Sequence, residues 1–133
     1  MNIKFFRNVL IHLTVVTGLF LSQAGFADYI VGEEANRSGD RDTAFKEFYN
    51  AAQNKNARAY GKLGSMYLYG LGTPKDYRQA YIWFHMAYLS GEREGERFRD
   101  AASSTMSRKE YLEAVEEAEQ QRLKLELGKT PEH

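Results

Sequence analysis

The chain carries an internal repeat with a period of 36 residues, and this spacing limits what it can fold into. Asp40 falls on Asp76 when the sequence is shifted by this period, and small and aromatic positions then stay in register. The further matched pairs are Ala44 with Ala80, Phe45 with Tyr81, Phe48 with Phe84, Tyr49 with His85, and Ala51 with Ala87. A period in the thirties is typical of a helical solenoid, in which each unit buries its apolar face only against its neighbours.

Residues that start or stop helices set the expected helix boundaries. A short polar side chain at a helix start can accept a hydrogen bond from one of the free backbone N–H groups of the first turn. Glu110, three residues after Ser107, adds the reciprocal bond of a capping box. The expected caps are Asp40, Asn56, Asp76 and Ser107. The sequence predicts six helices, over about 29–37, 41–53, 57–69, 77–90, 94–104 and 108–127.

A glycine inside the expected third helix points to close helix packing. In a helix interior, Gly64 lowers the stability of the helix by about 1 kcal/mol relative to alanine. That cost is tolerable where the missing side chain lets a neighbouring element approach closely. The following helix offers a facing stripe of small and aromatic residues, namely Tyr77, Ala80, Phe84 and Ala87. We therefore expect these two helices to form an antiparallel pair.

The N-terminus has the layout of a secretory signal peptide. A basic start at Lys4 precedes an apolar run from Val9 to Leu21. Gly25 and Ala27 then stand at the −3 and −1 positions of a cut before Asp28. Basic start, apolar centre and small residues at the cut are the three parts of such a signal. We expect residues 1–27 to be removed.

The alternative for this segment is an uncleaved membrane anchor. Its apolar run is about 13 residues long, whereas a membrane-spanning helix needs about 20. A lipoprotein anchor is excluded because the chain has no cysteine. The sequence therefore favours export to a bacterial periplasm, or secretion beyond it.

Composition restricts the chemistry of the remaining chain. Removal of Lys4 and Arg7 leaves 16 basic residues against 18 acidic ones, a formal charge of −2. Nucleic-acid binding needs a basic excess or patch, so a nucleic-acid partner is not expected. The absence of cysteine excludes disulfides, thiolate metal sites and thiol catalysis.

A specific order of small and aromatic residues runs through residues 57–91. It comprises Leu63-Gly64, Met66-Tyr67, Gly70, Gly72, Pro74, Asp76-Tyr77, Ala80, Trp83-Phe84, Ala87 and Gly91. In this order the segment resembles the Sel-one-like repeat family (SLR), a relative of the tetratricopeptide repeat. Residues 29–56 match more loosely, and residues 92–127 depart from the pattern.

The resemblance implies an all-α fold, a short right-handed α-solenoid of about three antiparallel helix pairs. It also implies a role as an adaptor or binding module. A charged segment replaces the next repeat after residue 91, so the last two helices are expected to form a terminal cap with one apolar face. The expected divisions are a signal peptide (1–27), a loose repeat (28–56), the best repeat (57–91), a capping helix pair (92–127) and a flexible tail (128–133).

The sequence predicts no catalytic, cofactor-binding or metal-binding residue. His85 has no second histidine, cysteine or suitably spaced acid beside it to complete a metal site. The loop 70–75 lacks the spacing of a phosphate-binding loop, and Ser107 is explained by helix capping. The acids Glu116 and Glu117 belong to a solvated helix face.

Aromatic residues are the best candidates for partner contacts. Exposed Tyr and Trp are enriched at interface hot spots, although these residues could equally fill a small solenoid core. The candidate partner-binding residues are Tyr60, Tyr67, Arg78, Tyr81, Trp83, His85 and Tyr88.

Three functions fit these observations to different extents. The leading hypothesis is an exported protein–protein interaction module that holds a partner protein in a concave aromatic groove. An alternative is an inhibitor or immunity protein that neutralises a toxin acting in the periplasm. A cell-wall or β-lactam hydrolase is disfavoured, since the sequence shows no nucleophile–base pair.

Overall fold

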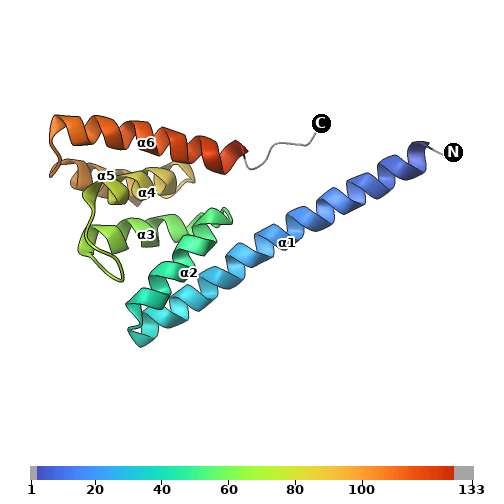
Figure 1. Cartoon of the computed structure of the whole chain (residues 1–133), viewed down its shortest axis with the longest axis horizontal. Coiled ribbons are helices and arrows are strands. Elements are labelled where there is room, and N and C mark those ends of the chain that lie inside the picture. The colour runs from blue at the N-terminus through green and yellow to red at the C-terminus, as the bar shows by residue number, and fades with distance from the viewer. Residues whose placement is uncertain (1–2, 128–133) are drawn as a thin grey trace.

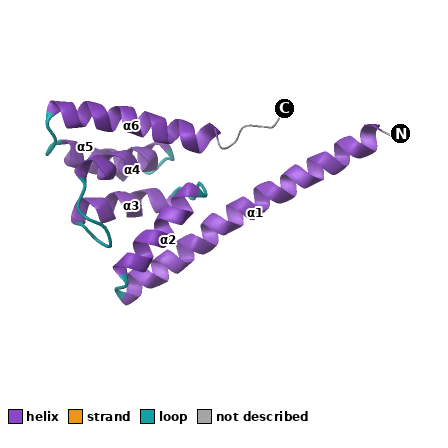
Figure 2. Ribbon diagram, in the orientation of Figure 1, coloured by secondary structure: helices purple, strands orange, loops and turns teal. Residues whose placement is uncertain are grey.

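A computed structural model describes residues 3–127, apart from the side chains of residues 5, 6, 8–22 and 127. Every element in this part of the chain is helical (Figures 1 and 2), which confirms the all-α prediction. The expected tail, 128–133, lies outside the described residues. The helices are α1 (Ile3–Ser38), α2 (Arg41–Gln53), α3 (Arg58–Tyr69), α4 (Tyr77–Leu89), α5 (Glu94–Ser103) and α6 (Arg108–Leu127).

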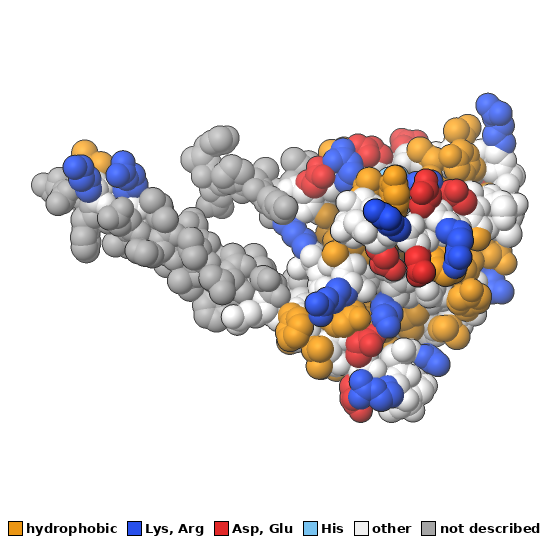
Figure 3. All heavy atoms as spheres, turned by 180° about the vertical axis from the view of Figure 1, so that it is seen from behind, with side chains coloured by type: hydrophobic (Ala, Val, Ile, Leu, Met, Phe, Trp, Pro, Cys, Tyr) orange, Lys and Arg blue, Asp and Glu red, His pale blue; other side chains and the backbone are white. Residues whose placement is uncertain are grey.

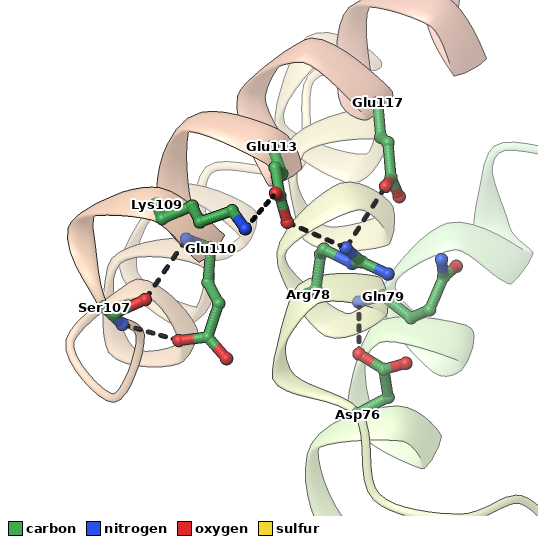
Figure 4. Close-up of polar contacts among 8 residues, drawn as sticks. All are labelled: Asp76, Arg78, Gln79, Ser107, Lys109, Glu110, Glu113 and Glu117. Carbon is green, nitrogen blue, oxygen red and sulfur yellow. Dashed lines mark hydrogen bonds and ion pairs between the residues drawn. The ribbon is translucent and has the colours of Figure 1, made fainter.

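Three of the four predicted caps form. Asp40 Oδ1 accepts from the backbone N–H of Thr43 at 3.1 Å, which caps α2. In the same way, Asp76 Oδ1 accepts from the N–H of Gln79 at 3.0 Å at the start of α4. Figure 4 shows the capping box of α6, where the Ser107 N–H donates to Glu110 Oε2 at 2.7 Å and the Glu110 N–H donates to Ser107 Oγ at 3.3 Å. The prediction for Asn56 is wrong, because Ala57 occupies the N-cap position of α3 and makes no side-chain cap bond, so α3 begins one residue later than predicted. Asn56 Oδ1 instead accepts from the N–H of Arg58 at 3.1 Å.

The sequence repeat is also a repeat of packing. Its alanines, at 44, 51, 80 and 87, have no exposed surface, and Phe48 and Phe84 are buried. A glycine of the preceding helix lies against each phenylalanine ring. A Cβ on Gly32 would approach the Phe48 ring to 2.8 Å, and one on Gly64 would approach the Phe84 ring to 2.7 Å. The two helices of each pair, α1–α2 and α3–α4, therefore pack against each other through the same kind of contact, a glycine against a phenylalanine ring.

Helix α4 is the centre of the bundle. It packs against α3, α5 and α6, and it buries residues on every side. Gly95 lets α5 cross close to α4, since a Cβ there would lie 2.7 Å from the Tyr88 backbone nitrogen. The last two helices thus differ from the first two pairs, because α6 has α4 and not α5 as its main neighbour.

Helix α1 is longer than the sequence predicted. It begins at Ile3 and not near Tyr29, because the preceding segment contains no proline and continues in helical conformation. In the described part of the structure, α1 contacts the other helices from Gly25 onward. The carbonyl oxygen of Gly25 accepts a hydrogen bond from Asn56 Nδ2 at 2.9 Å. The N-terminal part of α1 projects away from the other helices (Figure 1). Among the described residues, no helix combines the length and apolar character needed to cross a membrane.

Candidate binding site

A cavity of about 580 Å³ lies where α6 faces α2, α3 and α4. Three aromatic residues, one from each of the latter helices, form part of its wall. Amide and charged side chains from α4 and α6 form most of the remainder. The lining residues are Tyr49, Tyr67, Asp76, Gln79, Ile82, Trp83, Glu117, Gln120, Gln121 and Lys124.

Trp83 is the buried aromatic centre of this region, with 2% of its surface exposed. Tyr60 stacks on one side of the indole, with ring centroids 5.8 Å apart and planes inclined by 28°. Tyr49 meets the indole at 74°, with centroids 6.0 Å apart. Among the described residues, neither the Trp83 Nε1–H nor the Gln121 Nε2 amide has a hydrogen-bond partner, although both residues line the cavity.

An ionic cluster joins α6 to α4 beside the cavity. Arg78 Nη1 lies 3.2 Å from Glu113 and 3.5 Å from Glu117, and Lys109 lies 3.8 Å from Glu113 (Figure 4). These side chains are about 40% exposed, apart from the more exposed Lys109. Exposed pairs of this kind are worth about 0–1 kcal/mol each. The position of α6 depends mainly on Ala114 and Ala118, which are buried against α4, and the ion pairs add to this packing at the surface.

A second aromatic group lies where α4 meets α5 and the start of α6. Tyr81 stacks on His85, with ring centroids 6.1 Å apart and planes inclined by 3°, and it meets Tyr111 edge to face. Burial, with a further contribution from Tyr111, raises the pKa of Tyr81 to about 12. The Arg99 guanidinium lies 5.3 Å from the centre of the Tyr88 ring and 3.4 Å from His85 Nδ1.

The structure distributes the seven predicted contact residues over several places. Tyr67 and Trp83 line the cavity, and Arg78 holds α6 beside it. Tyr60 lies in the core under Trp83, and it also lines a separate groove near the end of α6. The second aromatic group contains Tyr81, His85 and Tyr88. The seven residues therefore do not form one surface, and their role in binding stays a prediction.

Eight of the ten lining residues are not among the predicted contact residues, and Tyr49 and Gln121 show why. Tyr49 matches His85 in the repeat, which does not mark it as a contact residue, yet it lines the cavity and is 39% exposed. Gln121 reaches the site because α6 packs on α4, an arrangement that the repeat pattern does not contain. Only the adjacent amides Gln120 and Gln121, which stand between the charged residues Glu119 and Arg122, could have indicated it.

We expect His85 to make the protein less stable in mild acid. Burial, aided by the positive charges of Arg99 and Arg122 and opposed by Glu119, holds its pKa below the usual value. The unfolded chain then takes up a proton first as the pH falls below about 6.5. The free energy of unfolding should therefore decrease from about pH 6.5 downward, until the folded protein is also protonated.

The His85→Gln variant should lose this part of the pH dependence. Urea unfolding between about pH 7 and pH 5 measures it, above the range in which ordinary carboxylates titrate. Parallel curves for the wild type and the variant over this range would contradict the prediction.

Comparisons with known proteins agree with the repeat seen in the structure. Residues 57–92 match the Sel1 repeat family. An uncharacterised Sel1-like repeat-containing protein of Schizosaccharomyces pombe is 41% identical over 56 residues, a match that covers 41% of this chain and 8% of the yeast protein. No solved structure is significantly similar to the chain. Sel1 repeats generally mediate protein–protein interactions and typically serve as scaffolds. The similarity to the Sel1 repeat therefore covers residues 57–92, which hold the helix pair α3–α4 and its connecting loop.

Proposed function

We propose that the chain is an exported module that binds a partner protein through the cavity between α2, α4 and α6. The observation that carries this proposal is the composition of the cavity, where Tyr49 and Tyr67 stand beside amide and charged side chains. Interfaces are typically built from aromatic anchors with a polar rim. The face of the protein in Figure 3 has acidic and basic side chains interspersed with apolar ones, which favours a protein over a nucleic acid.

Export with cleavage before Asp28 is the second part of the proposal. The contacts that attach α1 to the rest of the protein mostly follow this position. Asn54 donates to Asp28 at 3.1 Å, the Tyr29 ring lies 5.6 Å from the Phe48 ring, and Lys62 pairs with Glu33 at 2.8 Å. A chain that starts at Asp28 keeps all of these contacts and loses the bond to the Gly25 carbonyl. N-terminal sequencing of the mature protein tests the cut, and an intact N-terminus would contradict it.

Site-specific cross-linking tests the binding surface. A photo-reactive amino acid at position Gln120, on the cavity wall, should cross-link to a discrete partner in the cells that produce the protein. The matched control is the same residue at Val115, an exposed position of α6 that does not line the cavity. Cross-links from Gln120 but not from Val115 are expected. Equal products from both positions, or none from either, would overturn the proposal.

A further inference from the structure

A second groove lies on a different side of α6 from the cavity, and the proposed function does not use it. The two share no lining residue, although both have a volume of about 580 Å³. The groove is found where the ends of α4 and α6 meet the turn between α2 and α3. We call it the Lys55 groove, and its wall includes Lys55, Tyr60, Met86, Leu89, Arg122 and Leu125.

The floor of the Lys55 groove is apolar. Tyr60, Met86 and Leu125 are buried and come from three different helices, so the floor is held by the core of the protein. Leu89, at the edge of the groove, is 48% exposed. An apolar side chain that enters the groove would remove this surface from water, which is the main favourable contribution to association. The exposed edge leaves room for a chain to continue past the groove.

The charges at the rim favour an acidic group beside that apolar side chain. Arg122, on the α6 wall, is already bound by Glu119 at 2.5 Å and by Glu126 at 2.6 Å. Lys55 belongs to the other wall, in the turn between α2 and α3, and has no ion pair within the described residues. The same holds for the exposed Arg58, three residues later. A carboxylate on this wall therefore finds positive charge that the chain does not compensate.

The backbone of Lys55 gives this side chain further weight. Its φ is 63°, in the left-handed region, where the turns after α1, α3 and α4 have Gly39, Gly70 and Gly91. Glycine adopts this conformation freely, whereas a residue with a side chain adopts it at an energetic cost. The chain thus keeps a lysine where glycine would relieve the backbone. Strain of this kind is typical of functional positions.

We propose that the Lys55 groove docks a segment of a partner protein in which an apolar side chain stands next to an acidic one. The apolar side chain packs on Tyr60, Met86 and Leu125, and the carboxylate pairs with Lys55. Such a segment fits the apolar floor and the basic wall together, which a basic or purely polar segment does not. The proposal goes beyond the proposed function, because it adds a contact surface that is separate from the cavity.

The methyl group of Met86 reports on the floor of the groove, and its NMR resonance in the ¹³C-methyl-labelled full chain provides the test. The probe is the capped peptide acetyl-Gly-Leu-Glu-Gly-amide, and the comparison peptide has glutamine in place of glutamate. We expect a saturable shift, with a dissociation constant of about 1 mM or weaker for so small a ligand. The glutamine peptide should bind about twofold to fivefold more weakly, the effect of one exposed ion pair. High salt should reduce this difference, because it screens exposed charges.

Two substitutions of Lys55 separate its role in binding from its role in the fold. Lys55→Gln should abolish the preference for the acidic peptide, whereas the matched control Lys46→Gln, at an exposed position of α2, should keep it. Lys55→Gly should also abolish the preference, and it should unfold at a higher urea concentration than the wild type, because glycine relieves the left-handed backbone. The backbone amide spectrum verifies that each variant is folded.

Each other outcome overturns the proposal. The absence of a saturable shift, or equal binding of the two peptides, would mean that the groove does not recognise an acidic segment. Tighter binding of octanoate than of the acidic peptide would assign the groove to a fatty acid. A shift of the Met86 resonance with protein concentration alone would assign it to a second copy of the chain. An unchanged preference in Lys55→Gln would place the carboxylate elsewhere, and a lower stability of Lys55→Gly would show that the fold requires the lysine.

Discussion

Replacing Trp83 by alanine is expected to lower the free energy of unfolding by about 3–5 kcal/mol, the usual cost of removing a buried large aromatic side chain. The indole is 2% exposed and packs against Tyr60 and Tyr49, so its loss leaves a cavity that links α2, α3 and α4. A domain of this size is stable by about 5–15 kcal/mol, and the variant should therefore unfold at a much lower urea concentration. Tyr88→Ala, at a residue that is 39% exposed, serves as the control and should cost far less.

A loss below about 1 kcal/mol for Trp83→Ala would contradict this prediction, because a change of that size is typical of a surface position. The expected loss also affects how binding is tested. A variant that is partly unfolded loses its partner for reasons unrelated to contact. Substitutions at Gln121 on α6 are therefore better suited than Trp83→Ala to measure what the cavity contributes to binding.

The second large effect is expected at Gly72, in the loop between α3 and α4. Its backbone has a φ of 68°, and a Cβ would lie 2.1 Å from the carbonyl oxygen of Arg41 at the start of α2. Alanine would have to push the loop away from α2, and so separate the first helix pair from the second. We expect Gly72→Ala to cost about 1–3 kcal/mol for the steric conflict, in addition to the strain of the left-handed conformation.

Gly70→Ala is the matched control for this prediction. Gly70 has the same φ of 68°, but the atom nearest to a Cβ placed there, the Lys75 backbone nitrogen, is 3.5 Å away, an ordinary contact distance. Thermal unfolding of the two variants therefore separates the backbone strain, which both share, from the contact with Arg41. Equal losses of stability in the two variants would show that the contact between the helix pairs tolerates a methyl group.

The helices themselves could be predicted from local sequence. Asp40 and Asp76 cap the helices that follow them, and the glycine at 70 ends α3 in the left-handed conformation. These signals act within one turn of a helix, so they can be seen without the tertiary structure. The start of α1 could not be placed in this way, because the segment before Tyr29 has the layout of a signal peptide, and that layout predicts removal and not a helix of the mature fold.

The site was harder to predict, since it depends on where α6 packs. Four consecutive residues of α4, from Tyr81 to Phe84, are all buried. A helix that is apolar on every side does not show which side faces a neighbour and which faces a groove. The structure resolves this, because α5 and α6 both pack on α4 and a cavity remains on the side toward α2 and the later part of α6.

The continuous course of α1 has a consequence for the timing of maturation. If residues 1–27 are removed as proposed, the bond to be cut lies within a helix whose Gly25 is already attached to the turn after α2. A protease acts on backbone that has opened locally, and docked helical segments open rarely. Cleavage and docking of α1 therefore compete, and the order in which they occur decides whether the new N-terminus is ever produced. Variants that weaken the docking, such as Asn56→Ala, would be processed faster than the wild type.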